Sequence, residues 1–283
     1  MRTVPAALPA ALLALTISAI LPQAIHAQDA ASKNGTAQAA DPTATPFLQN
    51  AAAPEGVISV TAEERLATSV CPGVAIPIKV AYPQGFDAGG PVDKAVKAKT
   101  DSMMARAKTD AEEYAEKPEE CDPLSNASYG LNSTAYRISS KAHSVLFIWD
   151  QYMGGAHPVY GYVSMNLAAD GTELTAANLF TDPAKSLPLL WERIYRSTCS
   201  GDHETAPSYY GSPACSKDAV PALPEPLAPG STLDVMGHAT LTSLGLTINL
   251  DPYDAWSWAE GPVRLDIPKA DLVTMGADPA LWN

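Results

Sequence analysis

The run Val145-Leu146-Phe147-Ile148-Trp149 is continuously apolar and is typical of a central strand. A glycine-rich break, Gly154-Gly155-Ala156-His157, follows it closely. Residues 160–167 then alternate, with aliphatic side chains on one face and tyrosines on the other. The pattern predicts two strands with a turn or bulge between them, and the rest of the fold is built outward from this pair.

Alternating apolar residues predict further strands on both sides of the central pair. They occupy residues 74–83, 135–139, 244–250 and 263–267. Pro77 cannot donate a backbone hydrogen bond, so it predicts an edge position or a bulge in the first of these strands.

Two segments carry helical periodicity. Residues 92–117 place apolar side chains at helical spacing between charged ones. In the second helix, predicted for residues 186–197, one stripe is expected to pack against a sheet. It consists of Leu187, Leu190, Trp191, Ile194 and Tyr195.

Strands outnumber helices, and the two do not alternate regularly along the chain. The predicted class is therefore α+β, with antiparallel sheets and one long helix packed on each. We expect two closely associated units, residues 56–168 and residues 169–283.

The N-terminus has the features of a cleavable export signal. Arg2 precedes an apolar stretch that ends near Ala27, a small residue suited to cleavage. Residues 1–27 are therefore predicted as a signal peptide, with an uncleaved anchor as the alternative. Residues 28–55 contain few large apolar side chains, which favours a flexible linker. No later segment is long and apolar enough to span a membrane, so a periplasmic or secreted protein is expected.

Four cysteines in an exported chain indicate two disulfides. Cys199 and Cys215 are close in sequence and bracket a loop, so we pair them, and Cys71 then pairs with Cys121. The alternative is a metal site in which Cys199, His203 and Cys215 are ligands.

The formal net charge is −13. Such a surface repels nucleic acid and favours basic partners, although acidity also serves solubility alone.

Three stretches resemble a known family. They are residues 152–158, residues 171–180 and the segment 250–268, which contains Pro252-Tyr253 and Gly261-Pro262. Together they look like a DUF3298 domain at 169–283, preceded by a DUF4163-like domain at 56–168. This tandem resembles the extracytoplasmic part of a lysozyme-sensing anti-sigma factor and the N-terminal region of a peptidoglycan deacetylase. The resemblance implies a non-catalytic module of the bacterial cell envelope.

The glycine-rich break is the first candidate binding region, with Tyr152, Gly154, Gly155 and His157. Small residues let a ligand approach the backbone, and histidine can act as a base or metal ligand. The alternative is a turn in which His157 is hydrogen-bonded locally.

Aromatic residues between two predicted strands form the second candidate region. Tyr253, Trp256 and Trp258 are residue types enriched at binding surfaces, unless the loop folds back onto the core. Acidic residues, among them Asp254 and Glu260, lie near them. With His157 they give the alternative function, a metal- or acid/base-dependent hydrolase or deacetylase of envelope glycans.

No motif of a known catalytic class is present in the sequence. We therefore expect a non-catalytic envelope protein without cofactor or metal. Its predicted partner is a basic protein such as lysozyme, or peptidoglycan, and not nucleic acid.

Overall fold

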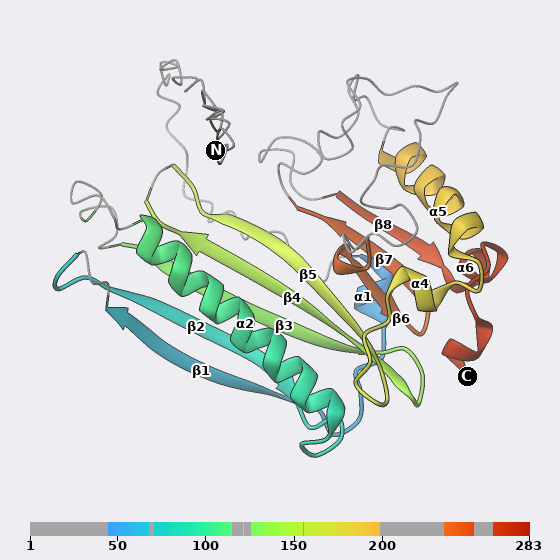
Figure 1. Cartoon of the computed structure of the whole chain (residues 1–283), viewed down its shortest axis with the longest axis horizontal. Coiled ribbons are helices and arrows are strands. Elements are labelled where there is room, and N and C mark those ends of the chain that lie inside the picture. Colours follow the sequence, from blue (N-terminus) through green and yellow to red (C-terminus); the bar gives the residue numbers. More distant parts are fainter. Residues whose placement is uncertain are drawn as a thin grey trace, which may run out of the picture. The chain divides into compact units, whose positions relative to one another are not determined.

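The described residues form two β-sheets with helices (Figure 1). The computed structural model describes residues 45–67, 71–114, 121, 126–154, 156–198, 235–251 and 263–283. The first sheet has the strand order β1-β2-β3-β4-β5, and the second has the order β6-β7-β8. The strands are β1 (Ile58–Ala67), β2 (Ala75–Gln84), β3 (Ser128–Arg137), β4 (Ala142–Tyr152), β5 (Val159–Ala168), β6 (Ala239–Thr242), β7 (Gly245–Leu250) and β8 (Val263–Pro268). The helices are α1 (Pro46–Asn50), α2 (Pro91–Tyr114), α4 (Ala176–Leu179), α5 (Pro183–Thr198), η4 (Val235–His238), α6 (Lys269–Thr274) and η6 (Pro279–Trp282).

The five-stranded sheet is mixed, which corrects the prediction of purely antiparallel sheets. β2 and β3 pair in parallel, with Lys79 opposite Gly130, whereas the other pairs are antiparallel. The physical reason is the 24-residue helix α2 between these strands. A helix of that length returns the chain to the starting end of the next strand, as a parallel pair requires. The α+β class and the antiparallel second sheet agree with the prediction.

Helix α2 lies along one face of the five-stranded sheet (Figure 1). Val92, Val96 and Ala107 of the helix are buried in the same cluster as Ile78 and Phe147 of the sheet. The turn before the helix is held by two carboxylates. Asp87 accepts the Val92 N–H at 2.9 Å, and Asp93 accepts the N–H groups of the preceding loop. The Asp87 bond satisfies a backbone donor at the start of the helix, and the Asp93 bonds fix the loop before it.

The apolar stripe of α5 lies in the core that contains the second sheet. All the stripe residues are buried there, with Leu241, Ile248 and Ile267 of the three strands. The predicted packing of this helix on a sheet is therefore confirmed.

The two sheets contact each other through a buried polar seam centred on Asn166 of β5. Its amide donates to the carbonyl of Ala239 at 2.7 Å, and its Oδ1 accepts the Leu241 N–H at 2.8 Å. The same oxygen accepts the Ser144 hydroxyl at 2.6 Å. A neighbouring bond joins the hydroxyls of Ser164 and Thr240. Because all these groups are buried, each depends on its partner for hydrogen bonding.

Replacing Asn166 with leucine is expected to lower the free energy of unfolding by roughly 2–3 kcal/mol. The leucine leaves the buried Leu241 N–H and Ala239 carbonyl without this partner, at a similar side-chain volume. Urea denaturation followed by circular dichroism measures the effect. Asn132→Leu, at an exposed position of β3, is the matched control and should change stability by less than about 0.5 kcal/mol. Equal effects of the two substitutions would contradict this account of the seam.

The N-terminal part of the fold differs from the expectation in two places. The predicted linker 28–55 contains α1, whose Leu48 is buried beside Tyr136, Leu146 and Tyr162, so its described end is not a free linker. Pro77 is not on an edge strand, because β1 pairs along the whole outer side of β2. The signal peptide, residues 1–27, lies outside the described residues.

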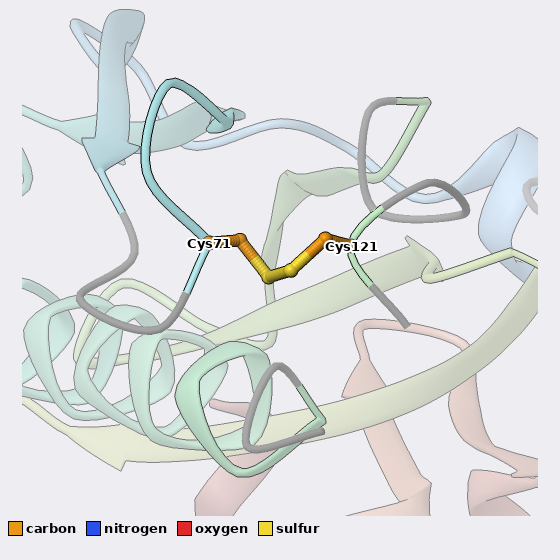
Figure 2. Close-up of a disulfide and its surroundings, with 2 residues drawn as sticks. All are labelled: Cys71 and Cys121. Carbon is orange, nitrogen blue, oxygen red and sulfur yellow. A yellow bond between two sulfur atoms is a disulfide. The ribbon is translucent and has the colours of Figure 1, made fainter. Parts of the chain in front are cut away.

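Cys71 and Cys121 form a disulfide, as predicted (Figure 2). Cys71 precedes β2 and is buried with Ile76, Ala111 and Met153, so the bond is part of a small apolar cluster. Such bonds are typical of oxidising, extracytoplasmic compartments. Cys199, His203 and Cys215 lie outside the described residues.

Candidate functional site

The glycine-rich break is the turn between β4 and β5. Tyr152 ends β4 opposite Ser128 of β3, and Gly154 has a φ of 93°, which favours glycine. The His157 Nδ1 donates to the carbonyl of Pro158 at 3.0 Å. A local hydrogen bond of His157 is what the turn interpretation of the glycine-rich break expects. Gly155 lies outside the described residues.

The aromatic loop is described at its two ends. Tyr253, Trp256 and Trp258 themselves lie outside the described residues, as do Asp254 and Glu260. Asp251, directly before this segment, accepts the Tyr162 N–H on its Oδ1 at 2.8 Å. Arg264, just beyond it, donates from Nη2 to the Tyr162 hydroxyl at 3.1 Å, and its guanidinium lies 5.5 Å from the centre of that ring.

Asp251 and Arg264, on either side of residues 252–262, thus contact the same residue of β5. This is possible because β5 is the last strand of its sheet among the described residues, so the Tyr162 N–H on its outer side is not taken by a neighbouring strand there. The neighbouring Gly161 provides space for the approach. A Cβ at this position would overlap the Asp251 carboxylate and the Trp149 indole.

A groove of about 380 Å³ adjoins this anchor. Its walls come from α2, from Tyr129 of β3, from β4 and β5, and from His238 and Asp251. Trp149 provides an aromatic wall, and Arg106 and Asp110 provide opposite charges. Burial, followed by the charge of Asp150, raises the pKa of Tyr129 to about 12. Burial also raises the pKa of Tyr162, against the opposing effect of Arg264. Both phenols therefore remain neutral hydrogen-bonding groups at physiological pH.

The turn of the first predicted region, and the contacts of Asp251 and Arg264 on either side of the second, both adjoin β5. From Val159, next to the turn, to Tyr162, which holds the loop, β5 runs three residues, or about 10 Å. Gln151, beside Tyr152, lines the groove as well. The positioning roles of Tyr162 and Gly161 were not predicted. The signal for Gly161 was a glycine inside a strand, which marks a close approach of another group.

The enzyme alternative requires His157 to meet Asp254 or Glu260, and these two acids lie outside the described residues. Within the described ranges, no three His, Cys, Asp or Glu side chains gather in a way that would hold a metal ion. Among the helices described, none has the length and apolar character needed to cross a membrane.

The fold is similar to two solved structures. One is a member of the DUF3298 family from Bacteroides fragilis NCTC 9343, at 18% sequence identity and a TM-score of 0.46, covering 80% of this chain and 95% of that one. The other is a DUF3298 family protein from Pseudomonas aeruginosa PAO1, at 12% identity and a TM-score of 0.46, covering 81% and 98%. No protein-family profile and no curated protein matches the chain. The DUF4163 tandem and the relation to anti-sigma factors stay predictions.

Proposed function

We propose that this chain is an exported, non-catalytic protein of the cell envelope that binds a basic protein partner. The specific partner that we propose is a basic wall-degrading enzyme such as lysozyme. The observation that carries the proposal is the attachment of both ends of the aromatic loop to Tyr162, beside a groove. The protein is expected in the periplasm or outside the cell.

The composition of the loop supports a basic partner. Between Asp251 and Arg264 the sequence contains two tryptophans, one tyrosine and two further acidic residues, and no lysine or arginine. Acidic groups around aromatic residues accelerate encounter with a positively charged protein, and tryptophan is enriched among the residues that dominate binding energy. The net charge of −13 acts in the same direction over longer distances.

The anchoring at Tyr162 supports binding through the loop in a second way. Association costs free energy when a contact segment loses conformational freedom. A segment whose two ends are already fixed at one residue has less freedom to lose. The loop therefore suits a role in contact better than an unattached segment of the same composition.

Calorimetry of the exported protein with lysozyme tests the proposal. We expect binding that weakens between about 50 and 200 mM salt, because the charges are exposed. Trp256→Ala should weaken it by roughly 10- to 100-fold, as for a central aromatic contact. Tyr162→Phe removes the hydroxyl bonded to Arg264 but keeps the ring, and should weaken binding less.

The matched control is Leu189→Ala, at an exposed position on α5, which should bind like the unchanged protein. Soluble peptidoglycan fragments are tested in parallel. Binding to the fragments but not to lysozyme would mean that the partner is a glycan and not a protein. Release of products from the fragments would favour the hydrolase alternative, and no binding to either ligand would refute the proposal.

A further inference from the structure

A second and larger groove lies on the face of the five-stranded sheet opposite to α2. Successive side chains of a strand point to opposite faces. Ile78 and Val80 are buried on the α2 side, so Lys79 points to the other face. There, residues of β1 to β4 line a groove of about 520 Å³. Neither Asp251 nor Arg264, the described residues on either side of the aromatic segment, is among the residues that line it.

One row of residues crosses the floor of this groove. Glu63 of β1 is opposite Lys79 of β2, Lys79 is opposite Gly130 of β3, and Gly130 is opposite Asp150 of β4. A lysine and an aspartate thus flank a glycine. A Cβ on Gly130 would overlap the Asp150 carboxylate, so this glycine provides the space in which that carboxylate lies.

Of the three charged groups in the row, Lys79 and Asp150, on either side of Gly130, are available to a ligand. Within the described part of the chain, neither Lys79 nor Asp150 forms an ion pair or a side-chain hydrogen bond. Burial raises the pKa of Asp150, because a carboxylate away from water loses hydration. A cation at this carboxylate would offset that loss. The exposed Lys79 ammonium offers a complementary site for an anion.

We propose that this groove binds a short zwitterionic peptide, with its ammonium group at Asp150 and its carboxylate at Lys79. The Cα atoms of Lys79 and Asp150 are two strand spacings apart, about 10 Å. A dipeptide spans about 7 Å between its ammonium and carboxylate groups. A sugar ligand is less suited, because sugars are held by aromatic faces. Among the described residues that line the groove, the one aromatic residue, Tyr129, is only 6% exposed.

The test is an NMR titration of the exported protein with dialanine, N-acetyl-dialanine and dialanine amide. The Gly130 amide resonance reports on the floor of the groove. We expect free dialanine to bind at least about tenfold more tightly than either capped form, since each cap removes one charged group. Maltose, a neutral disaccharide, is the control for sugar binding and should not bind.

Two isosteric variants assign the charges. In Asp150→Asn the N-acetyl cap should no longer weaken binding, whereas the amide cap still does. In Lys79→Met the pattern should reverse. Lys94→Met, on the solvent side of α2, is the matched control and should keep the preferences of the unchanged protein. Gly130→Ala should weaken all three peptides by filling the floor.

Thermal unfolding of each variant separates loss of the site from loss of the fold. Asp150→Asn should unfold at the same temperature as the unchanged protein or higher, because it removes a partly buried charge. The proposal is overturned if dialanine shows no saturable shift at Gly130 up to about 20 mM, a range that covers a weak small ligand. It is also overturned if the capped peptides or maltose bind as tightly as free dialanine. The lysozyme test uses Trp256→Ala and Tyr162→Phe, and the peptide test uses Lys79 and Asp150, so each proposal can fail while the other holds.

Discussion

Replacing Trp191 with alanine is expected to lower the free energy of unfolding by about 3–5 kcal/mol. Trp191 is 2% exposed and lies in the core between α5 and the second sheet, with its ring 5.6 Å from that of Tyr195. Alanine removes most of the side chain and leaves a cavity that the surrounding buried residues only partly fill. In a chain of this size, each kcal/mol corresponds to a shift of about 2–4 °C in Tm.

Circular dichroism is the suitable measurement, because the substitution removes one of the tryptophans that fluorescence would report. Leu189→Ala, on the same helix, is the matched control. Leu189 is 46% exposed, so its truncation should change stability by less than about 0.5 kcal/mol. A loss below about 1 kcal/mol for Trp191→Ala would mean that α5 does not pack on the second sheet as described.

Replacing both Cys71 and Cys121 with alanine is expected to lower the free energy of unfolding by about 4 kcal/mol. The two cysteines are 50 residues apart, and a cross-link of that length removes much of the freedom of the unfolded chain. The buried cluster of Ile76, Ala111 and Met153 remains in the variant. The native fold should therefore persist, with a lower denaturation midpoint.

Guanidinium denaturation of the variant and of the unchanged protein measures this difference. The control is a Cys199→Ala/Cys215→Ala chain, which keeps the Cys71–Cys121 bond and shows whether the effect is specific to that bond. Peptide mapping of the native protein gives an independent check. Recovery of Cys71 and Cys121 as free thiols would refute the pairing.

The elements predicted most accurately from sequence have strong periodicity and full burial. The α5 stripe and the apolar run that became β4 owe their pattern to one dominant environment, the core. β1 shows the opposite case. Nearly all its residues are exposed, so burial imposes no alternation on residues 58–67 and no strand was predicted there. Likewise, neither strand's own sequence indicates that β2 and β3 pair in parallel. Only the helix between them indicates this direction.

Of the candidate site residues, those chosen by residue type stay predictions, and those that depend on strand register were not predicted, for a related reason. Residue type alone indicated the aromatic residues of the loop and His157. Asp150 follows an apolar run and resembles an ordinary strand end, and Gly130 resembles a weak strand residue. Their relation depends on register, since Gly130 is opposite Asp150 only after β3 and β4 have paired. Single-sequence patterns do not fix such register.

The contact of Asp251 with β5 also bears on self-association. A sheet edge with free N–H and carbonyl groups is a template for pairing with another chain, and this leads to aggregation. On β5, the Asp251 carboxylate takes the Tyr162 N–H that an incoming strand would require. On the opposite edge, β1 carries Glu63, Glu64 and Arg65, whose burial between stacked chains would be costly. The five-stranded sheet is therefore protected at both edges against growth into fibres, by a carboxylate on one side and by charge on the other.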